Sequence, residues 1–132
     1  MHVEQKVNGT WEHYSHPQTP RCYAVFAKMA NVRNYGAVDP ISQPRGLPND
    51  ISLRTRLDAD QWDDDGHSYS YLTQSEIAEL YEFVLENGTP SGFCGGFHDM
   101  FGYFYGDDFS THDKARCPQG IEDVRFVFWF DN

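Results

Sequence analysis

Histidine and carboxylate side chains are the residues of this chain that could bind a metal ion. His13 and His16 are separated by two residues, and a run of three aspartates ends two residues before His67. Zinc requires about four N, S or O ligands in a tetrahedral array, usually from two sequence clusters. Nothing in the sequence matches H-E-x-x-H, C-x-x-C or the calcium-loop pattern with its terminal glutamate. The pattern therefore favours solvated histidines in loops, and we expect no metal and no cofactor.

Two arginines could instead hold an anion, because planar guanidinium groups clamp phosphates and carboxylates. Arg45 lies in the proline-stiffened segment of residues 44–48, and Arg33 follows a predicted helix. There is no Walker pattern and no G-x-G-x-x-G. One alternative is a structural corner, with Arg45 capping carbonyls or pairing with Asp50. The other is a pocket that binds or hydrolyses a small anion or nucleotide, with Arg33 and Arg45 on the anion, His67 as acid or base, and Asp50 orienting an arginine.

Nucleophilic catalysis is weakly supported, so we expect no enzyme of that class. His67 and Ser68 are sequence neighbours, and neighbours seldom face each other. Cys94 has no basic residue nearby except His98, whereas a catalytic thiol requires an electropositive setting. The odd number of cysteines without a C-x-x-C pair predicts reduced, mostly buried thiols.

The charge is unevenly distributed along the chain. The formal net charge is −10, and residues 57–113 contain thirteen Asp and Glu but no Lys or Arg. Such a field repels nucleic acid and anionic membranes and attracts basic surfaces. We therefore expect a basic protein partner, no direct nucleic-acid binding and no membrane association, although acidity also simply favours solubility. The expected partner-binding residues are Asp58, Asp60, Asp63, Asp64, Asp65, Glu79, Glu82 and Glu86, with Phe83 as an apolar anchor.

The elements predicted first are a hairpin and a central helix. Asn8-Gly9 favours a type I′ turn in a hairpin over residues 3–14, followed by a loop over residues 13–20. Thr19-Pro20 resembles an N-cap followed by proline at the first helical position, which predicts a helix over residues 21–32. Prolines and glycines predict a long loop over residues 34–49, and five aspartates predict irregular chain over residues 58–66.

The second half of the chain contains the clearest patterns. Thr73 and Glu76 form a capping box before an apolar i, i+3, i+4 repeat that ends at Asn87-Gly88. Residues 91–109, rich in glycine and aromatic residues, favour short strands or a packed loop. Residues 124–130 are apolar on both faces, as in an inner strand. Together these elements predict a single α+β domain over residues 1–132, with a small, mostly antiparallel sheet and two principal helices on one face.

Several blocks of the sequence resemble a family of short, uncharacterised proteins of tailed bacteriophages and prophages. Pro40-Ile41-Ser42-Gln43-Pro44-Arg45-Gly46-Leu47-Pro48 and the block from Glu122 to Asn132, which contains Phe128-Trp129-Phe130-Asp131-Asn132, are the most specific. Residues 9–14, 21–34 and 66–73 are also similar, so the resemblance spans nearly the whole chain. Family members open with Met-Gly-Cys-Asp-Ile-His before a His-Val-Glu segment, whereas this chain begins Met1-His2-Val3-Glu4.

The resemblance implies a phage context and no particular activity. With the charge pattern, it predicts a phage accessory protein in the cytoplasm of the infected bacterium. Its acidic surface would mimic nucleic acid and inhibit a host component, such as a CRISPR effector or another defence complex. The alternative is the small-anion or nucleotide-binding protein or hydrolase described above.

Overall fold

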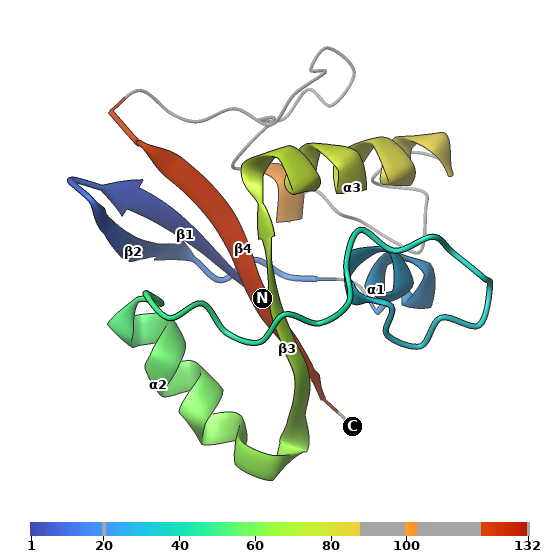
Figure 1. Cartoon of the computed structure of the whole chain (residues 1–132), viewed down its shortest axis with the longest axis horizontal. Coiled ribbons are helices and arrows are strands. Elements are labelled where there is room, and N and C mark those ends of the chain that lie inside the picture. Colours follow the sequence, from blue (N-terminus) through green and yellow to red (C-terminus); the bar gives the residue numbers. More distant parts are fainter. Residues whose placement is uncertain (20, 88–99, 103–119, 132) are drawn as a thin grey trace.

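The computed structural model describes residues 1–19, 21–87, 100–102 and 120–131. Four strands form one antiparallel sheet in the order β2-β1-β4-β3 (Figure 1). The elements are β1 (His2–Val7), β2 (Thr10–Ser15), α1 (Tyr23–Ala30), α2 (Leu53–Trp62), the short 3-10 helix η1 (Asp63–Asp65), β3 (Gly66–Thr73), α3 (Gln74–Glu86) and β4 (Asp123–Asp131). The predicted small α+β fold is therefore confirmed.

Three elements form where their local sequence predicts them. Asn8 and Gly9 both have positive φ, 51° and 78°, as the type I′ turn between β1 and β2 requires. The backbone N–H of Thr73 donates to Glu76 Oε1 at 3.0 Å, which completes the capping box of α3. β4 lies between β1 and β3, so both of its edges are paired, and five consecutive residues, 124–128, are buried, as expected of an inner strand.

Residues 58–66, predicted to be irregular, are instead helical up to Asp65, and Gly66 begins β3. α2 continues to Trp62 and η1 follows it directly. Ser52 is the N-cap of α2, and its hydroxyl accepts a hydrogen bond from the backbone N–H of Thr55. Only Thr55 and Ala59 of this helix are buried. The buried face of α2 therefore lacks the apolar repeat that identifies an amphipathic helix in a sequence.

The segment around Cys22 also differs from its prediction. α1 begins at Tyr23 with Cys22 as N-cap, and Asn31 ends it in the left-handed conformation. Thr19 therefore does not cap this helix, and Pro20 lies outside the described residues. Cys22 is disulfide-bonded, so the prediction that all thiols are reduced is wrong for this residue. Cys94 and Cys117 both lie outside the described residues.

The two faces of the sheet carry different side chains. Val3, Leu72 and Phe126 are neighbours across three strands and point into an apolar core shared with α1 and α3. Because adjacent residues of a strand point to opposite faces, His2 and Glu4 lie on the other side, where they contact α2. Figure 1 shows α2 well apart from α1 and α3. The predicted pair of helices thus accounts for one face, and α2 is an additional helix on the other.

Most of the segment of residues 91–109 lies outside the described residues, so its predicted form stays a prediction. Met100 and Phe101 are described, and both are fully buried in the core. Among the described residues, no helix combines the length and apolar character that crossing a membrane requires.

Candidate metal centre and adjoining pocket

Three histidines and one aspartate meet on the face of the sheet that α2 covers. His2 Nδ1 lies 2.9 Å from His13 Nε2, and His2 Nε2 lies 2.7 Å from Asp58 Oδ2. The ring centroids of His2 and His16 are 4.5 Å apart. One ligand atom from each of His2, His16 and Asp58 lies within 4.8 Å of the other two. Within the described ranges, no other group of three such side chains comes as close together.

A β-bulge directs His13 and His16 toward the same face. Val3 pairs with Ser15 but Glu4 pairs with His13, which leaves Tyr14 as an extra residue in β2. Residues three apart, such as His13 and His16, point to opposite faces of a regular strand. The extra residue reverses the alternation, and both rings consequently contact the ring of His2. His13 is thus a strand residue, as the predicted hairpin over residues 3–14 has it, and not one of the solvated loop histidines that the metal-ligand pattern favours.

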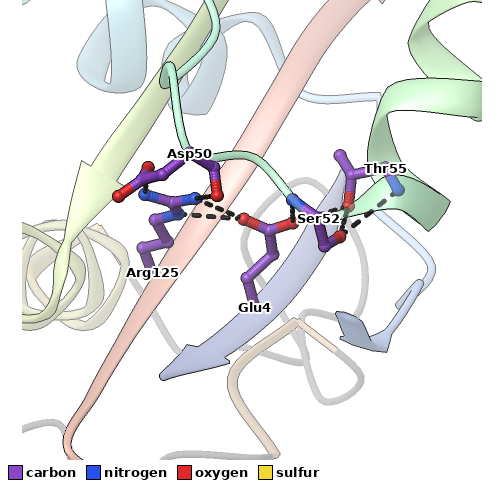
Figure 2. A network of polar contacts seen from close by, with 5 residues as sticks. All are labelled: Glu4, Asp50, Ser52, Thr55 and Arg125. Atoms are coloured by element: carbon purple, nitrogen blue, oxygen red, sulfur yellow. Dashed lines mark hydrogen bonds and ion pairs between the residues drawn. The ribbon is translucent and has the colours of Figure 1, made fainter. Parts of the chain in front are cut away.

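The buried carboxylate of Glu4 fixes the start of α2. Glu4 Oε2 accepts hydrogen bonds from the Ser52 backbone N–H and the Thr55 hydroxyl, both at 2.9 Å. Glu4 Oε1 accepts two more from Arg125, at 2.9 and 2.8 Å (Figure 2). Residues three apart lie on the same side of a helix, so the contact at Thr55 also turns Asp58 toward the sheet. Along β1, the neighbour of Glu4 on that face is His2.

Burial sets the protonation state of the histidine cluster. It lowers the pKa of His2 to about 4 and is also the main reason that the pKa values of His13 and His16 are lowered. All three imidazoles are therefore mostly neutral at pH 7, which is the form that binds metal ions. Burial alone would raise the pKa of Glu4, but hydrogen bonds from Ser52 and Arg125 outweigh burial and lower it. Glu4 consequently remains charged.

A pocket with a volume of about 500 Å³ adjoins the cluster at the open edge of β4. β1 pairs with β4 only between Asp123 and Val127, so the last residues of β4 are left with β3 as their paired strand. His16 and Asp58 line this pocket, which connects it to the histidine cluster. The lining also includes polar, charged and aromatic side chains, those of Thr19, Arg21, Phe26, Arg33, Trp62, Trp129 and Asp131.

The four residues predicted to hold an anion do not converge. Arg33 lines the pocket and donates to the Asp131 carbonyl at 2.8 Å, and His67 Nε2 lies 3.3 Å from the same carbonyl oxygen. Arg45 instead pairs with Glu76 through both of its terminal nitrogens. Asp50 pairs with Arg125, so it orients neither of the predicted arginines. Arg45 is the structural corner that the sequence offers as the alternative.

The acidic residues predicted as one surface divide between two sides of the sheet. Asp60, Asp63, Asp64 and Asp65 are exposed on α2 and η1, whereas Glu79, Glu82 and Glu86 are exposed on α3. Asp58 is half-buried against His2 and belongs to the histidine cluster. Phe83 is half-buried, with the ammonium of Lys28 5.5 Å from its ring centroid. A single partner surface therefore includes one group of carboxylates or the other.

Neither His2, nor the contact of Asp58 with it, nor the place of Arg21 at the pocket is predicted from the sequence. In the sequence, His2 immediately precedes the predicted hairpin and lies two residues before Glu4. Side chains two apart in a strand point to the same face, and this is the only local sign of the orientation of His2. The contact between His2 and Asp58 spans 56 positions and depends on α2, so no spacing rule identifies it. A comparison of the chain with protein-family models, curated proteins and solved structures finds no match.

Proposed function

We propose that this protein binds a divalent transition-metal ion through His2, His16 and Asp58. The proposal is carried by one observation, the approach of three ligand atoms to within 4.8 Å of one another. Two imidazoles and one carboxylate are the donor set of many catalytic zinc sites and of mononuclear iron(II) sites, both of which keep a coordination position open. The ligand atoms of tetrahedral zinc are about 3.3 Å apart, because each bond is about 2.0 Å long. Rotation of the exposed His16 and the half-buried Asp58 side chains can bring the separations to this value, which shortens the longest and lengthens the 2.7 Å between His2 Nε2 and Asp58 Oδ2.

His13 supports this arrangement from behind His2. A metal-binding histidine usually donates its other ring N–H to an acceptor, which fixes its tautomer. Without an ion, His2 Nε2 donates to the Asp58 carboxylate, which can only accept. In the metal-bound state the proton would lie on Nδ1, which faces His13 Nε2 at 2.9 Å, and Nε2 would be available to the ion. Because His16 and Asp58 line the pocket, an ion held by them would have its open position toward the pocket. There the ion would act as a Lewis acid toward a bound ligand.

The test is a calorimetric titration of tag-free, metal-free protein with zinc. We expect one zinc ion to bind per chain. The zinc affinity should fall by about tenfold to a hundredfold in His13→Ala and by more in His2→Ala and Asp58→Asn. His67→Ala is the matched control, because His67 contacts Ser68 and Asp131 and lies outside the cluster. Equal zinc affinity in His2→Ala and His67→Ala, with both variants folded by circular dichroism, would contradict the proposal.

A second proposed function retains the acidic partner surface and assigns it to α2. Leu53 and Leu57 are 73% and 54% exposed, and their i, i+4 spacing gives α2 an apolar outer stripe. This stripe adjoins the exposed carboxylates of Asp60, Asp63, Asp64 and Asp65. Apolar anchors beside one-signed charge suit a basic protein partner. In this proposal the chain is a phage accessory protein that occludes the nucleic-acid-binding groove of a host defence complex, of which a CRISPR effector is one kind.

A further inference from the structure

Two guanidinium groups, those of Arg21 and Arg33, contribute to the lining of the pocket at the open edge of β4. The Cζ atoms of Arg21 and Arg33 lie 5.7 and 5.4 Å from the ring centroid of Tyr23, so the same ring supports both. Arg21 donates to the Tyr23 hydroxyl at 3.2 Å, and Arg33 donates to the Asp131 carbonyl at 2.8 Å. A guanidinium has five N–H donors, so one such bond leaves others that can reach an anion.

Aromatic rings form another part of the same lining. Phe26, Trp62 and Trp129 all line the pocket. Trp129 is held between two other rings, with its centroid 5.3 Å from that of His2 and 5.5 Å from that of Tyr69. Trp62 is 36% exposed and presents part of its indole to solvent. Planar rings bind by stacking on such surfaces, which favours a ligand with a flat, unsaturated part.

The lining also contains an unsatisfied polar group. The hydroxyl oxygen of Thr19 is buried and has no hydrogen-bond partner among the described residues, although Thr19 lines the pocket. Buried hydroxyl groups are normally hydrogen-bonded, and leaving one unpaired is costly. A ligand with several acceptor oxygens would satisfy it.

The charge of the pocket selects the kind of anion. Arg21 and Arg33 are balanced on the lining by Asp58 and Asp131, so these side chains sum to zero. The metal ion of the proposed function, on which this step rests, adds two positive charges beside Asp58. The loaded pocket then favours a dianion over a single carboxylate. Phosphate monoesters are dianionic near neutral pH, and arginine forks match their oxygens.

From these observations we infer that the pocket binds a small phosphate monoester that carries a planar ring, with nucleoside monophosphates as the model class. The phosphoryl group lies between the arginines and the metal ion, and the ring lies against Trp62 and Trp129. The volume of about 500 Å³ is in the range of pockets for ligands of this size.

The experiment measures binding of phenyl phosphate and adenosine 5′-monophosphate to the zinc-loaded full chain by calorimetry, with phenol and adenosine as phosphate-free controls. We expect both phosphates to bind and both controls to fail. Arg33→Ala and Arg21→Ala should each weaken binding at least tenfold, and Arg33→Lys should retain part of it. Arg56→Ala is the matched control, because Arg56 is not among the residues that line the pocket.

The zinc titration performed beforehand separates the two proposals. If zinc binds but neither phosphate does, or if Arg33→Ala and Arg56→Ala bind phosphate equally well, the ligand inference is overturned while the metal site stands. If zinc does not bind, the phosphates are titrated into the zinc-free protein. Binding that depends on Arg33 would then support the anion pocket alone, and its absence would overturn the inference as well.

Discussion

Glu4 and Arg125 are register partners on β1 and β4, and their side chains form an ion pair that is almost completely buried. The Glu4 side chain is 0% exposed and that of Arg125 is 8% exposed. The guanidinium also pairs with Asp50 at 2.8 Å and lies 3.9 Å from the ring centroid of Trp11. Because Glu4 additionally binds the start of α2, one buried carboxylate connects two central strands to the helix that carries Asp58.

Removing Glu4 should be strongly destabilising. Glu4→Ala leaves the Arg125 charge buried without its main partner, and breaking a buried pair in this way costs about 3–5 kcal/mol of unfolding free energy. Urea denaturation of both proteins measures the difference. Glu12→Ala, an exposed carboxylate on the same hairpin, is the control and should change stability by less than about 0.5 kcal/mol. Similar losses in the two variants would show that the network does not hold α2.

The Arg45–Glu76 pair predicts a pH dependence. Hydrogen bonds from Arg45 lower the pKa of Glu76 below its ordinary value of 4.5. A carboxyl group whose pKa is lower in the folded state stabilises the fold above its unfolded pKa, and that contribution is lost as pH falls through the folded value. Wild type should therefore be more stable than Glu76→Gln at about pH 7, and the difference should shrink below about pH 4. Thermal melts across this range measure it, and a pH-independent difference would contradict the assignment.

The disulfide of Cys22 predicts sensitivity to reductant. The denatured, unreduced protein should be lighter than the reduced protein by the mass of two hydrogen atoms, as measured by intact mass spectrometry. Reduction should lower the unfolding free energy by about 2–4 kcal/mol. Cys22→Ser is the internal control, because reductant should not destabilise it further. If reductant destabilised wild type and Cys22→Ser equally, the stabilising disulfide would not involve Cys22.

The division of the acidic residues predicts which charges a partner recognises. Replacing Asp63, Asp64 and Asp65 together by Asn should weaken capture of a basic partner from bacterial lysate, as measured by mass spectrometry. Replacing Glu79, Glu82 and Glu86 by Gln removes the same charge from α3 and should leave capture unchanged. Captured protein should also dissociate at high salt, where screening acts over a few ångströms (about 3 Å at 1 M). Equal effects of the two triple variants would argue against a surface centred on α2.

Much of the fold is predictable from short sequence patterns. Asn8-Gly9, the capping box at Thr73 and the doubly apolar strand over residues 124–130 each specify local geometry through neighbouring residues, and each forms as predicted. α2 is not predictable in this way, because contacts of Ser52 and Thr55 with a glutamate about fifty positions away hold it in place. A helix that packs on the sheet through polar contacts does not need an apolar repeat on its buried face, so the repeat cannot be used to predict it.

The candidate site depends more strongly on tertiary structure. The sequence alone determined the α+β class, the hairpin that bears His13, and the concentration of negative charge, since these follow from composition and local periodicity. Only the folded chain decided that His13 and His16 point to one face, because that depends on the bulge at Tyr14. It also decided that Arg33 lies at a pocket with Arg21 whereas Arg45 does not. Such convergence is a property of strand register and helix docking, which buried long-range contacts determine.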